Sequence, residues 1–153
     1  MDLTPSLIIN STEEVFSSLM IQSITPGPPY YRTETPAEDG MTGVIYFSGR
    51  TTGYTAIHTP METAEMVARD FLFGEDLDIT EEVIEDTMRE VVNILAGRVK
   101  AYIDPPGSNV SLSLPELRRG NDFSPAPLPD AMRITVPFYL DDGQFWVEVQ
   151  LVQ

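Results

Sequence analysis

The sequence contains no cysteine and only one histidine, His58. Without cysteine there is no disulfide framework, no thiolate nucleophile and no cysteine-based zinc site. With a single histidine, a Ser-His or Cys-His catalytic pair is not expected. His58 also has no potential metal ligands near it in the sequence. We therefore predict that His58 is a residue near a strand end without a catalytic or metal-binding role.

Basic residues are scarce as well. The 153 residues include 9 Lys and Arg against 24 Asp and Glu, which gives a formal net charge of -15 and a pI near 4.1. Such a surface repels phosphate backbones and anionic lipids, so nucleic acid and membrane are excluded as main partners. A protein with positive charge around its own site would be attracted to this surface.

Long apolar runs are absent, and every run is far shorter than the roughly 20 residues that span a membrane. The N-terminal sequence MDLTPSLII lacks the basic region of a secretory signal. These features predict a cytoplasmic location. The sequence has no G-x-S-x-G, P-loop, H-E-x-x-H or dinucleotide-binding glycine motif. The 42% hydrophobic content is typical of a globular protein, and residues 1–153 are expected to form one domain.

The most informative segment is 80–103, TEEVIEDTMREVVNILAGRVKAYI. At about 100° per residue, its apolar residues form a single stripe, which predicts a helix packed on a core. The stripe consists of Ile84, Met88, Val91, Val92, Leu95 and Val99. Asp78 or Thr80 is expected to cap the start of this helix.

A second line of residues lies almost opposite that stripe: Asp86, Glu90, Asn93 and Gly97. An idle helix face usually carries good helix formers, but Asn is a poor one and Gly costs about 1 kcal/mol relative to Ala. Gly97 also leaves room for another backbone to approach. The line is consistent with a docking face, and a solvated face that tolerates these residues is the alternative.

Two more helices are predicted. A capping box of Ser11 and Glu14 indicates a helix over residues 11–22, and a second box of Thr59 and Glu62 indicates one over 59–73. Gly74 is expected to end the latter.

Alternation and β-branched content predict the strands, which we place at residues 41–48, 54–58, 109–114, 132–140 and 144–152. The first two and the last two are expected to form hairpins. Two proline-rich loops, 24–40 and 104–130, have no role that the sequence assigns. The order of elements predicts an α+β fold, with helices packed on an antiparallel or mixed sheet.

The segment DTMREVVNILAGRVKA resembles the phosphatase helix of the CheX/CheC/FliY family, bacterial chemotaxis proteins that dephosphorylate the response regulator CheY. The family pattern is Asp or Ser, three residues, Glu, two residues and Asn, followed in CheX-like members by Ala-Gly. The residues that match are Asp86, Glu90, Asn93, Ala96 and Gly97. The order of elements is similar over nearly the whole chain, which implies a CheX/CheC-like fold.

The single E-x-x-N sequence resembles the CheX type, which implies a homodimer. The resemblance implies that the partner is a phosphorylated CheY-type response regulator, whose own site holds Mg²⁺ and a lysine, and that this chain binds no cofactor or metal. Asn93 would orient the attacking water and Glu90 would pair with the lysine, while Asp86, Arg89 and Gly97 would contact the partner. Arg89 replaces the usual Gly of CheX-like sequences, and a bulky cation there can alter docking. The alternative is a non-catalytic module of the same fold that binds receiver domains or another signalling protein.

Overall fold

The computed structural model describes residues 3–19, 21, 23–31, 39–72, 78–120, 123 and 130–152. The described helices are α1 (Pro5–Ser18), α2 (Met61–Phe71) and α3 (Glu81–Ile103). The described strands are β1 (Thr25–Pro26), β2 (Met41–Gly49), β3 (Thr52–Thr59), β4 (Val110–Leu112), β5 (Glu116–Arg119), β6 (Met132–Leu140) and β7 (Gly143–Val152).

The seven strands form one sheet in the order β1-β6-β7-β3-β2-β4, and β5 also pairs with β2. Every pairing is antiparallel. The predicted hairpins β2–β3 and β6–β7 both form, and β3 pairs with β7 to join them at the centre of the sheet. The α+β prediction is therefore confirmed, and the sheet is antiparallel rather than mixed.

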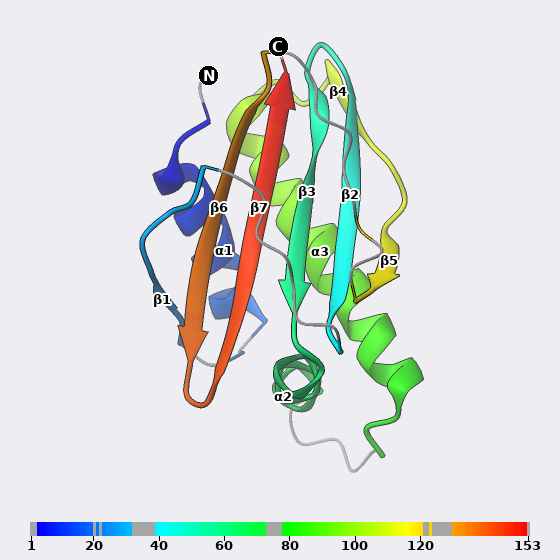
Figure 1. Ribbon diagram of the computed structural model, residues 1–153. Coiled ribbons are helices and arrows are strands. Elements are labelled where there is room, and N and C mark those ends of the chain that lie inside the picture. The colour runs from blue at the N-terminus through cyan, green and yellow to red at the C-terminus, as the bar shows by residue number, and fades with distance from the viewer. Residues whose placement is uncertain are drawn as a thin grey trace.

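The helices α1 and α3 lie on one face of this sheet, and α2 lies at one end of it (Figure 1). Alternate strand residues point toward the helices, as the two-residue period of a strand requires. Phe16 of α1 stacks on Phe145 of β7 with ring centroids 4.9 Å apart, and Phe145 stacks on Phe138 of β6 at 5.3 Å. The main hydrophobic core thus lies between the helices and the sheet.

Gly43 of β2 determines how closely α3 approaches the sheet. A Cβ atom at this position would lie 3.2 Å from Val92 Cγ1 and 3.3 Å from Val92 Cβ. Because a glycine stands there, the middle of α3 rests directly on β2. The opposite side of the same turns of α3 therefore points away from the sheet.

The start of α1 was predicted wrongly. The helix begins at Pro5, and the Thr4 side chain accepts a hydrogen bond from the Leu7 N–H at 3.2 Å. Ser11 is fully buried in the helix interior and does not cap it. Thr4 and Ser11 are both residue types that can cap a helix. The helix begins directly after Thr4 because this earlier start adds the apolar surface of Leu7 and Ile8 to the core.

The start of α2 was also predicted wrongly. Thr59 is the last residue of β3 and pairs with Met41, so its backbone belongs to the sheet. The helix cap is Pro60, which has no side chain able to bond the first N–H groups. The predicted helix end near Gly74 lies outside the described residues. For α3, the Thr80 prediction is confirmed, because its Oγ1 accepts from the Val83 N–H at 3.2 Å.

Strand β5 was not predicted, because ELRR shows no apolar alternation. It is a strand because β2 offers an unpaired edge. Pro137 lies in β6, where its carbonyl accepts from the Gly27 N–H at 2.8 Å beyond β1. The missing N–H of Pro137 therefore faces the short edge strand and removes no bond to β7.

Candidate functional site

The outward side of α3 carries the line of residues that the sequence singled out. The stripe opposite it, from Ile84 to Val99, is buried as predicted. Asp86, Glu90, Asn93 and Gly97 are all exposed. We call these four residues the polar ridge. The structure brings them together because residues three and four apart lie side by side on a helix.

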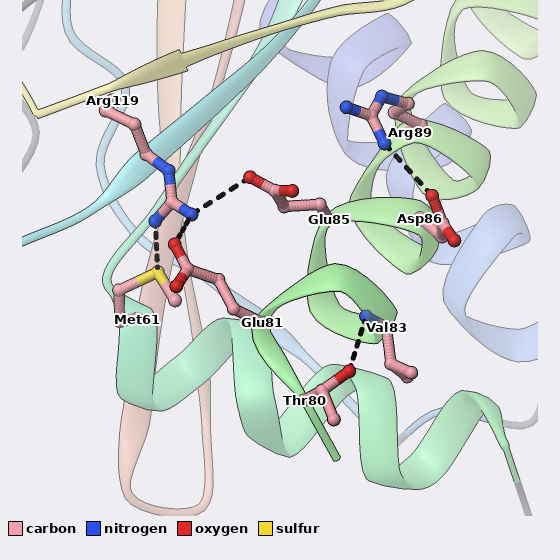
Figure 2. Close-up of polar contacts among 8 residues, drawn as sticks. All are labelled: Met61, Thr80, Glu81, Val83, Glu85, Asp86, Arg89 and Arg119. Carbon is pink, nitrogen blue, oxygen red and sulfur yellow. Dashed lines mark hydrogen bonds and ion pairs between the residues drawn. The ribbon is translucent and has the colours of Figure 1, made fainter.

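The N-terminal end of α3 is held to the rest of the molecule by Arg119 of β5 (Figure 2). Its guanidinium donates to Glu85 Oε2 at 3.0 Å, to Glu81, and to Met61 Sδ of α2 at 3.3 Å. Arg119 therefore links β5 and α2 to the N-terminal turns of α3. Its two partners on α3 lie 34 and 38 residues away in the sequence, so no local pattern could predict these contacts.

The C-terminal end of α3 is held against α1. The Tyr102 hydroxyl donates to Glu14 Oε1 at 2.7 Å, and this hydrogen bond to a carboxylate raises the pKa of Tyr102. Beyond the helix, Asp104 is buried and its Oδ2 accepts from the Val110 N–H at 3.0 Å, where β4 begins. With both ends fixed, the polar ridge is presented on a rigid helix rather than on a loop.

Arg89 lies beside the polar ridge and pairs with one of its members. Its Nη1 donates to Asp86 Oδ1 at 3.0 Å, and Figure 2 shows the guanidinium turned toward Asp86. The side chains of Arg89 and Asp86 are 43% and 69% exposed. An exposed ion pair of this kind contributes about 0–1 kcal/mol, so it can be exchanged for another partner at little cost.

Gly97 leaves the C-terminal end of the polar ridge bare. A Cβ atom added at this position would meet nothing within 4 Å. No contact inside the described part of the chain therefore requires glycine here, although glycine weakens the helix. The bare surface next to Asn93 and Glu90 is accessible to another protein.

A second polar cluster occupies the helix-free face of the sheet, and it contains the single histidine. His58 Nδ1 lies 2.8 Å from Thr42 Oγ1, and His58 Nε2 lies 2.8 Å from Glu148 Oε1. Tyr54 donates to the other oxygen of Glu148, and Arg133 Nε lies 3.8 Å from it. Sequence analysis missed this cluster, because its members come from four strands and its hydrogen-bonded pair Tyr54 and Glu148 is 94 residues apart.

Three members of this cluster are buried away from water. The exposed fractions of Thr42, His58 and Glu148 are 0%, 1% and 0%. Phe123 lies against the rings of Tyr54 and His58, with centroids 5.3 and 5.6 Å away. Side chains with so little exposed surface, bonded to one another, are typical of a network that supports a sheet.

Burial, and next the charge of Glu148, raise the pKa of Tyr54 well above its ordinary value. The unfolded chain therefore loses this proton near pH 10 while the folded chain keeps it. The contribution to stability is complete below about pH 10 and is lost as the pH rises above it. We expect the unfolding free energy of Tyr54→Phe to fall less between about pH 9 and 11 than that of wild type.

Urea unfolding at the two pH values measures this difference. Tyr139→Phe, at an exposed tyrosine, is the matched control. Equal pH slopes for wild type and Tyr54→Phe would show that Tyr54 ionises alike in the folded and unfolded chain.

Among the described residues, no set of three or more His, Cys, Asp or Glu side chains is placed to hold a metal ion. In the same part of the chain, no helix is long and apolar enough to cross a membrane.

The described fold is an antiparallel sheet with helices on one face, and the polar ridge lies exposed on α3. We compared this arrangement with known proteins. The sequence profile described as "Chemotaxis phosphatase CheX" matches residues 41–139, which include the whole of α3. This chain belongs to the CheX chemotaxis phosphatase family. No curated protein sequence matches it.

Solved structures agree in fold over almost the whole chain. A putative chemotaxis protein from Desulfovibrio vulgaris Hildenborough has a TM-score of 0.80 and 22% identity, covering 96% of this chain and 95% of that one. CheX from Desulfovibrio desulfuricans has a TM-score of 0.79 and 22% identity, with 96% and 97% covered. The CheX of a CheX–CheY–BeF3–Mg²⁺ complex from Borrelia burgdorferi has a TM-score of 0.77 and 21% identity, with 97% of each chain covered.

Proposed function

We propose that this protein accelerates the hydrolysis of the aspartyl phosphate on a CheY-type response regulator. Water attacks the phosphorus atom, the aspartate carboxylate of the partner leaves, and inorganic phosphate is released. The observation that carries the proposal is the pair of exposed side chains Glu90 and Asn93, three residues apart on a helix that is otherwise fixed in place. Family membership and the fold of the Borrelia burgdorferi CheX, crystallised with CheY, support it.

We assign to Asn93 the role of orienting the attacking water molecule. A primary amide donates through its NH₂ group and accepts through its oxygen, so it can orient a water molecule without changing charge. Phosphoryl transfer needs positioning and charge stabilisation more than covalent chemistry from the protein. A neutral side chain suffices for this task, which fits a chain with no histidine or cysteine on the ridge.

Glu90 is assigned to docking. A carboxylate on the polar ridge can form a charge-assisted hydrogen bond with the lysine of the receiver site, which fixes the register of the two proteins. Asp86 lies one turn earlier and would support the same contact, and Gly97 would admit the partner's backbone. The Mg²⁺ that the reaction needs would be the partner's, as in the Borrelia burgdorferi complex, whose contents include Mg²⁺. The homodimer and the cytoplasmic location also remain proposals.

The test is to follow phosphate loss from a phosphorylated CheY-type receiver domain in Mg²⁺ buffer, with and without this protein. The expected result is loss that is faster and increases with the amount of this protein at substoichiometric levels. Binding of the receiver with an unchanged rate of phosphate loss would overturn the proposal and favour the non-catalytic binding module.

Gly97→Ala gives a second test in which stability and activity move in opposite directions. Alanine is the better helix former and meets no obstacle, so the unfolding free energy should rise by about 1 kcal/mol. A methyl group in a close contact costs about 1–3 kcal/mol, so the catalysed rate at low partner concentration should fall on the order of 10-fold.

Ser17→Ala is the control, because it changes an exposed position of α1 away from the polar ridge. Urea denaturation and phosphate release measure the two effects. A stabilised Gly97→Ala variant with the full catalytic rate would remove Gly97 from the docking surface.

A further inference from the structure

Arg89 lies on the same side of α3 as Asn93. In the proposed reaction, this side faces the partner's phosphoryl group. Arg89 precedes Asn93 by four residues, and the two side chains lie about 40° apart around the helix axis. Glu90 lies about 100° away from Arg89, so the cation is on the Asn93 side of the polar ridge. A guanidinium that turned from Asp86 toward Asn93 would lie next to a phosphoryl group attacked by a water on Asn93.

The contact that holds Arg89 in the free protein is weak and uses only part of its donor set. One nitrogen, Nη1, donates to one oxygen of Asp86, and both side chains are substantially exposed. Within the described residues, no hydrogen bond engages Nε or Nη2 of Arg89. The guanidinium thus keeps most of its planar set of five N–H donors, which matches the oxygens of a phosphate group.

The other cations of α3 are held elsewhere. Arg98 lies 3.9 Å from Glu14 of α1, and the Lys100 ammonium donates to the Gly107 carbonyl at 3.3 Å. Both partners lie outside α3. Arg89 is the α3 cation whose described partner, Asp86, itself belongs to the polar ridge. Docking at the ridge therefore disturbs the Arg89 contact directly.

The negative charge of the polar ridge makes a cation beside it important for binding a phosphoryl group. The polar ridge carries two carboxylates, Asp86 and Glu90, on a chain of net charge -15. A phosphoryl group approaching such a surface is repelled unless a cation faces it. We infer that Arg89 exchanges Asp86 for the partner's phosphoryl group on docking, and so makes binding depend on phosphorylation. This inference rests on the proposed function.

A partner without the phosphoryl group offers no such exchange, so Arg89 stays with Asp86. The ridge then presents one uncompensated carboxylate, Glu90, for the partner's lysine. When the phosphoryl group is present, Arg89 adds a charge-assisted contact to it. The same contact also stabilises the negative charge of the transferring group.

The experiment compares binding of a CheY-type receiver domain alone with binding of the same domain loaded with beryllofluoride and Mg²⁺, a mimic of the phosphoryl group. Wild type should prefer the loaded form. Arg89→Gln should lose about 10-fold of that preference, because a hydrogen bond to a charged group is lost. Arg98→Gln, at an exposed arginine of the same helix, should keep the preference of wild type.

A double variant separates this role from simple neutralisation of Asp86. If Arg89 only cancels the charge of Asp86, Asp86→Asn combined with Arg89→Gln restores the preference. If Arg89 contacts the phosphoryl group, the double variant remains as poor as Arg89→Gln alone. Asp86→Asn alone should weaken binding of both forms of the receiver, because Asp86 supports docking, but it should leave the ratio of the two affinities unchanged, because Arg89 is still present.

Failure of the inference and failure of the proposed function are distinguishable. If wild type accelerates phosphate loss and Arg89→Gln has the same preference for the loaded receiver, only the role of Arg89 is overturned. Restoration by the double variant has the same consequence. If wild type does not accelerate phosphate loss, the proposed function itself is wrong.

Discussion

Asn93→Ala is expected to lower the catalysed rate of phosphate loss by about 10²- to 10³-fold, by analogy with removal of one positioned catalytic group. In the proposed reaction, water is the nucleophile and the amide of Asn93 holds it in line with the bond that breaks. Alanine keeps the helix but provides neither donor nor acceptor. The partner's own slow hydrolysis sets the rate that remains.

This loss should occur without damage to the fold. Asn93 is exposed on α3, and alanine is a better helix former than asparagine, so the unfolding free energy should stay the same or rise slightly. Binding to the receiver should weaken much less than the rate, because Glu90 still docks. The measurement is the rate of phosphate release at saturating and at low concentrations of this protein.

Asn10→Ala provides the matched control. Asn10 is an exposed asparagine in α1, away from the polar ridge, and its replacement should leave the rate unchanged. An Asn93→Ala variant with the rate of wild type would show that Asn93 does not position the water, whatever else the ridge does.

Glu148→Ala is expected to lower the unfolding free energy by about 3–5 kcal/mol, the cost of breaking a buried ionic network by removing one member. Glu148 has no exposed surface and bonds both His58 and Tyr54. Its loss leaves their polar groups buried without the acceptor that they use, and it leaves a cavity in the sheet. A domain of this size is typically stable by about 5–15 kcal/mol, so the variant would be strongly weakened.

Urea denaturation measures this effect, and two further variants define it. Glu65→Ala removes an exposed carboxylate that pairs with Arg69 on α2, and its cost should be about 0–1 kcal/mol. Glu148→Gln keeps the shape of the side chain and one acceptor oxygen. Its loss of unfolding free energy should therefore lie between those of Glu65→Ala and Glu148→Ala. It replaces Glu148→Ala in the measurement if that variant does not fold. A Glu148→Ala variant as stable as Glu65→Ala would show that the buried cluster does not hold the sheet together.

The contrast between α3 and the two other helices shows where sequence reasoning succeeds. The pattern of α3 runs over 23 residues, has one capping residue in the right place, and meets no competing element. At Thr59 a capping signal competed with strand pairing to Met41, and the sheet prevailed because ladder hydrogen bonds outnumber a single cap. Ser11 also matched a capping pattern, but Thr4 caps α1 instead, because the earlier start buries two more apolar residues.

From the sequence alone, three properties of this protein follow: the hairpins, the long helix, and the placement of Asp86, Glu90, Asn93 and Gly97 on its outward side. All three depend on periodicity and local turn chemistry, which act over a few residues. Only the tertiary structure decided that β5 pairs with β2, that Arg119 fixes α3, and that His58 lies in a buried network with Glu148. Those contacts join residues between 34 and 90 positions apart, or depend on which strand edge is free, and no local pattern encodes such distances.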